Sequence, residues 1–122
     1  MSATIRCKSK MKDAKMIAEA IVKVCENVKD QVTSSESQVR LSARAFSGYR
    51  DILWSQKTDK TFEASYDVDD TAKIRKMSKQ DNFFQVVEQW YSALVTAETL
   101  KTQGFFPVVK QDGDRLRVLA QA

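Results

Sequence analysis

Hydrophobic residues near the N-terminus first alternate with polar ones and then recur every three to four residues. Ala3, Ile5 and Cys7 alternate with polar residues, which is typical of a half-buried strand. From Met11 to Lys29 the apolar side chains instead share one face of a helix, and they are Ala14, Ile17, Ile21, Val24, Cys25 and Val28. The pattern predicts a strand followed by a long amphipathic helix.

Three alternating stretches in the middle of the chain predict an antiparallel meander. A polar, hydroxyl-rich segment, 30–38, precedes them and predicts an exposed loop. Ser47-Gly48 and the segment 57–60 have the composition of turns. The predicted strands cover residues 39–45, 50–56 and 61–67.

The last third of the chain predicts a second long helix and a closing hairpin. Residues 72–78 fit either a short strand or a helical turn. The helix is predicted from Lys79 or Gln80 to Gln103, and Gly104 follows where a left-handed C-terminal cap is expected. Asp112-Gly113 is a strong hairpin dipeptide, and it joins predicted strands over residues 105–110 and 115–119.

These elements predict an α+β fold, an antiparallel sheet with two amphipathic helices on one face. The expected order is β-α-β-β-β-α-β-β, an elaborated ferredoxin-like arrangement. No repeat, linker or low-complexity tract divides the chain, so residues 1–122 are predicted to form a single domain.

Composition places the chain among soluble globular proteins. Of its 122 residues 43% are apolar and 30% are charged, so it can bury a core. The apolar runs are too short to cross a membrane. The first seven residues carry no basic segment followed by an apolar stretch, so we expect no signal peptide and a cytosolic location.

The chain lacks the residues that several classes of reaction require. It contains no histidine, which excludes serine–histidine, cysteine–histidine and histidine–zinc chemistry. Cys7 and Cys25 match neither a redox nor a zinc spacing, and three glycines cannot build a phosphate cradle. No catalytic residue and no cofactor is predicted. The lack of catalytic motifs favours a protein that is not an enzyme.

Three acidic residues follow the meander closely. Asp67, Asp69 and Asp70 have a spacing at which carboxylates can hold magnesium or calcium. The glycine and the distal glutamate of a calcium loop are missing, and aspartates favour turns and helix starts in any case. A turn is the preferred interpretation, and no metal ligand is assigned.

Basic residues give the clearest candidate for a binding site. The net charge is +4, and Arg6, Arg40 and Arg44 occupy polar positions of predicted strands, with Ser42 between the last two. If the helices cover one face of the sheet, these arginines would share the other face, where guanidinium groups could bind phosphate. A solvated charged face is the competing interpretation. The candidate set is Arg6, Arg40, Ser42, Arg44, Arg50 and Trp54.

Aromatic residues of the meander suggest RNA binding, because RNA-binding sheets stack bases on aromatic side chains. Phe62, Ala64 and Tyr66 share one face, which burial under the helices explains. Tyr49 and Trp54 stay open to either role.

The C-terminal part of the chain resembles a family of conserved small open reading frames found in cyanobacteria, plastids and some phages. The resemblance rests on Gln89-Trp90-Tyr91-Ser92-Ala93, the run 100–105 that ends Gln-Gly-Phe, and the hairpin around Asp112-Gly113. Members begin with a strand and a helix, as here, but carry more glycine between the meander strands. The family has no known function, so the resemblance implies a fold and a source rather than an activity.

Three functions remain open from the sequence. The first is a non-enzymatic binding protein that engages a nucleotide, a nucleic acid or a protein partner through the open sheet face. The second is an oligomeric assembly factor that pairs through the edge of the final hairpin. The third is a metal-dependent enzyme built on the aspartates of 67–70.

Overall fold

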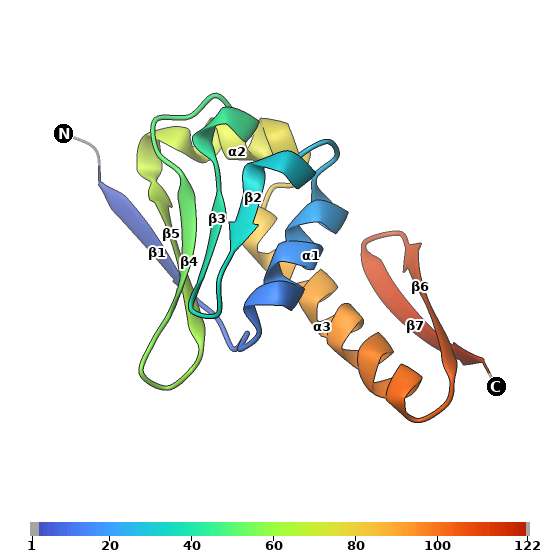
Figure 1. The fold of residues 1–122 in the computed structure, drawn as a ribbon. Coiled ribbons are helices and arrows are strands. Elements are labelled where there is room, and N and C mark those ends of the chain that lie inside the picture. The colour runs from blue at the N-terminus through green and yellow to red at the C-terminus, as the bar shows by residue number, and fades with distance from the viewer. Residues whose placement is uncertain (1–2, 122) are drawn as a thin grey trace.

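The computed structural model describes residues 3–121, and its main feature is a five-stranded antiparallel sheet (Figure 1). The strand order is β1-β5-β4-β3-β2. Residues 1, 2 and 122, which the predicted domain includes, lie outside the described part. The strands are β1 (Thr4–Lys8), β2 (Val32–Ser34), β3 (Gln38–Leu41), β4 (Ile52–Gln56) and β5 (Phe62–Asp67).

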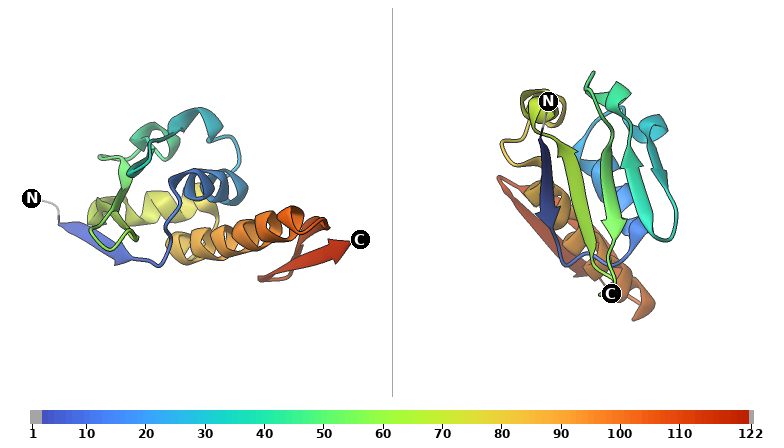
Figure 2. Two further views of the ribbon diagram at one scale, coloured as in Figure 1. Left: turned by 60° about the horizontal axis from the view of Figure 1, so that its bottom comes forward. Right: turned by 90° about the vertical axis from the view of Figure 1, so that its left-hand side faces the viewer.

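Two helices, α1 (Ala14–Val24) and α3 (Phe83–Thr102), lie on one face of this sheet (Figure 2). The α+β class and the meander are therefore as predicted from the sequence. The core between sheet and helices contains fully buried side chains from both layers, among them Ile17, Ile21, Leu41, Ile52, Trp54, Phe62 and Val87. Alternation in the strands and the helical stripe identify the same buried face.

The first helix is shorter than its apolar spacing predicts. Asp13 caps its start by accepting a hydrogen bond from the N–H of Met16 at 3.3 Å. The helix ends at Val24 because Cys25 takes an extended conformation, with φ of −112° and ψ of 127°. Asn27 then takes a left-handed conformation with φ of 61°, which asparagine tolerates better than most residues. Val28 is still buried, so the apolar spacing continues where the helix does not.

Residues 71–78 form a separate helix, α2 (Thr71–Ser78), which decides the ambiguity of that segment. Lys79 then adopts a left-handed conformation with φ of 58° and ends it. The next helix starts at Phe83, where the side chain of Asn82 accepts from the N–H of Gln85 at 3.2 Å. The prediction of a helix start at Lys79 or Gln80 is therefore wrong by about one turn.

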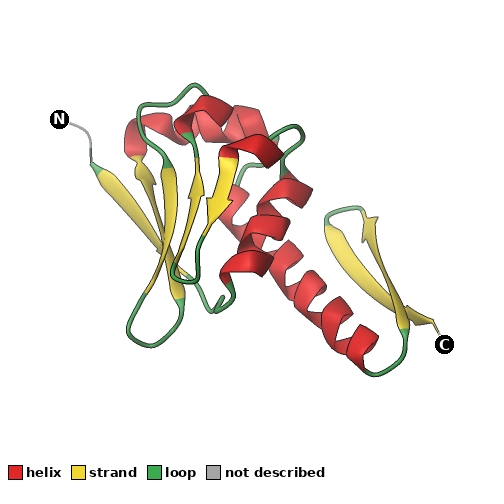
Figure 3. Ribbon diagram, viewed as in Figure 1, coloured by secondary structure: helices red, strands yellow, loops and turns green. Residues whose placement is uncertain are grey.

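The ferredoxin-like order is not confirmed, for three reasons visible in Figure 3. The predicted loop 30–38 contains the edge strand β2, and α2 adds a helix. The final hairpin, β6 (Phe106–Asp112) and β7 (Arg115–Gln121), forms a two-stranded sheet of its own. Gly104 and Gly113 do have positive φ, 89° and 64°, as a cap and a hairpin turn require.

The C-terminal half of α3 and the hairpin extend away from the main sheet (Figure 1). Within the described chain, no residue after Ala93 is buried. We call residues 94–121 the C-terminal arm. No helix in the described part of the chain combines the length and apolar character that a membrane span needs.

Candidate functional site

The sheet face opposite the helices is open to solvent (Figure 2). Strand register puts one row of residues across it, running from Arg6 through Ser65 and Leu53 to Arg40. A second row begins with Lys8 and continues through Glu63. Side chains of alternate residues point to opposite faces of a sheet, so both predicted arginines of these strands, Arg6 and Arg40, lie on the open face.

Cations outnumber the carboxylates that reach solvent on this face. Glu63 is shared by Arg6 and Lys57, each 3.6 Å from one of its oxygens. Asp51 lies 3.5 Å from the guanidinium of Arg40 and also accepts from the N–H of Ala43 at 2.8 Å. These exposed ion pairs contribute little stability. Among the described residues, Lys8 and Arg50 form no ion pair with a carboxylate.

A shallow pocket of 340 Å³ brings two of the predicted arginines together at the upper end of the face. Arg50 donates to the hydroxyl of Thr4 at 3.1 Å, which holds its guanidinium over the sheet. The ring of Tyr66 lies on the other side of the sheet, where it stacks on Phe84 at a centroid distance of 4.8 Å, and burial raises the pKa of its phenol above the usual range. The pocket lining consists of Arg40, Tyr49, Arg50, Asp51, Leu53, Ser65 and Tyr66.

Tyr49 gives this pocket an exposed aromatic rim. Its side chain is 70% exposed, yet its backbone N–H is held by both carboxylate oxygens of buried Asp70, at 2.9 and 3.0 Å. Lys73, from α2, places its ammonium 4.0 Å from the centroid of the Tyr49 ring, a cation–π contact. The backbone of Tyr49 is therefore anchored, while most of its ring faces solvent.

The loop that carries Tyr49 is packed tightly beneath. A Cβ on Gly48 would lie 2.1 Å from the ring of Phe46 and 2.9 Å from Cγ of Asp70, so only glycine fits. Asp70 also accepts from the N–H of Arg50 at 3.2 Å. One carboxylate thus positions both Tyr49 and Arg50.

Ser42 and Arg44 do not join the site, and the strand predicted over 39–45 is wrong beyond Leu41. A 3₁₀ turn over Ala43–Ala45 follows, and Ser42 caps it by accepting from the N–H of Arg44 at 3.3 Å. A serine hydroxyl satisfies a backbone N–H readily, and this turn ends the alternation. Arg44 is exposed but does not line the pocket.

Trp54 also lies elsewhere, on the face that the helices cover. It is 1% exposed, and its ring meets those of Phe83 and Phe84 at centroid distances of 6.2 and 5.9 Å. Alternation along β4 explains this, because Ile52 and Trp54 share the buried face while Leu53 faces outward. We therefore remove Trp54 from the candidate set.

Two residues of the site were not assigned from the sequence. The sequence does not decide the role of Tyr49, although the Ser-Gly turn before it predicts a loop at the end of the sheet. Lys73 is not among the predicted site residues, because its contact with the Tyr49 ring depends on how α2 packs. Nothing in the sequence predicts that Asp70 would anchor the loop 21 residues before it.

Asp67 and Asp70 accept hydrogen bonds from backbone N–H groups. Asp67 caps the 3₁₀ turn Val68–Asp70 by accepting from the N–H of Asp69 at 2.9 Å. Asp70 accepts from the N–H groups of Tyr49 and Arg50. Among the residues that the structure describes, no three His, Cys, Asp or Glu side chains converge on a point that could hold a metal ion. The turn interpretation accounts for these contacts.

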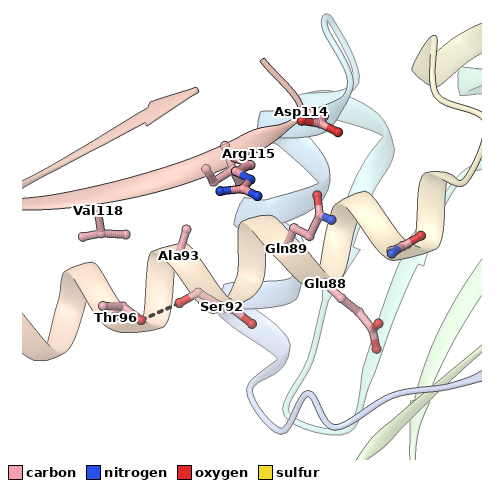
Figure 4. A pocket seen from close by; sticks show the side chains of 10 residues that line it. Glu88, Gln89, Ser92, Ala93, Thr96, Asp114, Arg115 and Val118 are labelled. Atoms are coloured by element: carbon pink, nitrogen blue, oxygen red, sulfur yellow. Dashed lines mark hydrogen bonds between the residues drawn. The ribbon is translucent and has the colours of Figure 1, made fainter. Parts of the chain in front are cut away.

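A larger pocket of 630 Å³ lies between α3 and β7 (Figure 4). Arg115 points from β7 toward the helix, whereas Glu88 points away from β7. Burial raises the pKa of Glu88. The hydroxyl of Thr96 already donates to the carbonyl of Ser92 at 2.9 Å. Since Asp114 offsets the single arginine of the lining, this pocket is less suited to an anion than the open face.

Comparison with known proteins adds no relative: no protein-family model, no curated protein and no solved structure matches the chain. The resemblance to the conserved small open reading frames stays a prediction. The candidate site is therefore the pocket on the open face, formed by Arg40, Arg50 and Tyr49 with Lys73 behind the ring.

Proposed function

We propose that this chain is a non-enzymatic binding protein that holds a phosphate-bearing ligand, a nucleotide or a single-stranded nucleic acid, on its open sheet face. The observation that carries the proposal is the convergence of Arg40 and Arg50 on one shallow pocket beside the exposed ring of Tyr49. A cytosolic setting, in which Cys7 and Cys25 stay free, is part of the proposal.

Each group has a chemical task in this proposal. The guanidinium groups of Arg40 and Arg50 bind phosphate oxygens through paired N–H donors. The ring of Tyr49 offers a surface on which a base stacks, and such stacking tolerates every base. Lys73 lies beside the ring and adds a positive charge where the sugar-phosphate chain would pass.

The ion pairs of the face affect how strongly a ligand binds. Asp51 holds Arg40 at 3.5 Å, so a phosphate must compete with this carboxylate. The pocket is shallow and open along the sheet, which favours an extended chain over an enclosed substrate. Because most of the binding energy would come from released counterions, we expect affinity to fall steeply with salt.

A charge-reversal experiment tests the proposal. Arg40→Glu with Arg50→Glu is compared with Arg115→Glu with Arg117→Glu on β7, a matched control that changes the net charge equally. Fluorescence anisotropy measures binding of a labelled thymidine oligonucleotide of about twelve residues. We expect the first pair to weaken binding at least about tenfold and the control to weaken it much less. Equal losses from both pairs, or no binding by the unaltered chain at low salt, would contradict the proposal.

The C-terminal arm supports a second candidate function, self-assembly through the edge of β7. The hairpin loop has two residues, so Asp112 and Arg115, which flank it, form a hydrogen-bonded pair. Such pairs alternate along an antiparallel ladder. The backbone N–H groups of Leu116, Val118 and Ala120 therefore point outward. Two-fold pairing about Val118 would place Arg115 opposite Gln121, so no like charges meet. The outer edge of β6 carries Pro107, which donates no hydrogen bond.

Sedimentation tests this second candidate. We expect a dimer at high concentration that Ala120→Pro dissociates, because proline removes an outward N–H while the pairing of β6 with β7 is kept. A monomer at every concentration would exclude it.

A further inference from the structure

Strand β1 is an edge of the main sheet, because among residues 3–121 it pairs with β5 alone (Figures 1 and 2). The N–H of Val68 donates to the carbonyl of Ala3 at 2.9 Å, and the register continues from this pair. Hydrogen-bonded pairs alternate along an antiparallel ladder, so Ile5 and Cys7 bond to β5. The N–H and C=O groups of Thr4, Arg6 and Lys8 must then point outward.

These outward groups have no bonding partner in the described part of the chain. Such a row of free donors and acceptors is a template for another strand. The opposite edge of the sheet is the three-residue strand β2, which is too short to be an equal template. β1 is therefore the edge of the main sheet at which a further strand could pair.

A groove lies beside Cys7 of β1, on the side that faces the helices. One part of it, of 370 Å³, extends toward Met11 and Glu88, and another, of 300 Å³, extends toward Arg75 of α2. The two parts share Cys7, Asn82 and Phe84 in their walls. Alternate side chains of an added strand would enter this groove and meet the ring of Phe84.

The other side of an added strand would face cations. The side chain of Arg6 is 72% exposed, and its acidic partner Glu63 is shared with Lys57. Lys8 stands directly opposite Glu63 in the register, so three cations surround one carboxylate. This excess is complementary to an acidic segment.

We propose that β1 binds an extended acidic segment of another protein as an added strand. The segment would alternate acidic residues, which face Arg6 and Lys8, with apolar residues, which enter the groove beside Phe84. A second copy of this chain fits poorly, because two-fold pairing about Arg6 sets Arg6 against Arg6. The inference concerns a different surface from the pocket of Arg40 and Arg50, and it does not depend on the proposed function.

The test uses three capped, labelled hexapeptides with the full-length chain. One alternates valine and glutamate, one alternates valine and lysine, and one carries three valines before three glutamates. We expect the alternating acidic peptide to bind at least about tenfold more tightly than either control. At saturation, hydrogen exchange measured by NMR should slow at the outward amides of Arg6 and Lys8.

Variants locate the site. Arg6→Gln with Lys8→Gln keeps the strand and removes its charge, so it should weaken binding of the alternating acidic peptide, whereas Lys23→Gln on the exposed side of α1 should not. Arg115→Glu with Arg117→Glu on β7, far from β1 in the fold, should also leave it unchanged. Equal binding of all three peptides, protection away from β1, or a dimer of the chain that pairs through β1 would overturn the inference.

Discussion

The carboxylate of Asp70 accepts the backbone N–H of Tyr49 through both of its oxygens, at 2.9 and 3.0 Å. Asp70 is fully buried at the start of α2, whereas the Tyr49 ring is exposed at the end of the open face. The interaction therefore connects a helix on one side of the molecule to the aromatic rim of the candidate site. It anchors the backbone from which the exposed ring projects.

Replacing Asp70 should cost stability. Asp70→Ala leaves the backbone N–H groups of Tyr49 and Arg50 without their acceptor, and we expect the free energy of unfolding to fall by about 2 to 4 kcal/mol. Urea unfolding measures the change. Asp69→Ala is the control: its side chain is exposed, so its effect should stay within about 0.5 kcal/mol. Equal effects from both variants would contradict the anchoring role of Asp70.

Replacing Tyr49 should affect binding and leave folding intact. Its ring is 70% exposed, so Tyr49→Ala should change the free energy of unfolding by less than about 0.5 kcal/mol. Loss of base stacking should weaken oligonucleotide binding by about 1 to 3 kcal/mol, measured by anisotropy. Tyr49→Phe keeps the ring and should bind nearly as the unaltered chain does. A Tyr49→Ala variant with full affinity would remove the stacking role.

Glu88 should make stability depend on pH. Burial raises its pKa in the folded state, so the folded chain holds this proton more tightly than the unfolded chain does. The stability linked to Glu88 is then fully present below its unfolded pKa and is lost as pH rises through the folded value. Glu88→Gln should therefore stabilise the chain near about pH 7 and change nothing near about pH 3. Urea unfolding at both values checks this, and a destabilised variant near neutral pH would refute it.

The C-terminal hairpin should be dispensable for folding of the main sheet. No described residue after Ala93 is buried, so a chain that stops after Gln103 should keep its core. We expect a cooperative thermal transition within about 8 °C of that of the full chain, which corresponds to about 1 to 2 kcal/mol. Loss of cooperative unfolding would mean that the hairpin contributes more than its exposure indicates.

Sequence patterns predicted those parts of the fold in which one face of an element is buried. The stripe containing Ile17 and Ile21 and the alternation of Ile52 with Trp54 both report a buried side directly. The patterns predicted less well where an element ends, because the backbone conformation of single residues sets these ends. Lys79 ends α2 through a left-handed conformation and Cys25 ends α1 through an extended one, and neither residue type requires this. The Ser42 cap ends a strand whose alternation continues in the sequence.

The candidate site was predicted only in part, for a related reason. Arg6 and Arg40 follow from strand alternation, which places them on the open face. Tyr49 and Lys73 meet through the packing of α2 against a loop distant in sequence, and no local pattern encodes that packing. Trp54 was assigned to the site because aromatic composition suggested stacking, although its own alternation with Leu53 points to the core.

The most direct test of binding at the open face is an NMR titration of the isotope-labelled chain with a thymidine oligonucleotide of about twelve residues. The account predicts that amide signals of Arg40, Arg50, Leu53 and Ser65 shift together, with those of Tyr49 and Lys73, and that added salt reverses the shifts. Signals of α1 and of the hairpin should stay unchanged. Shifts confined to the hairpin, or none at low salt, would contradict it.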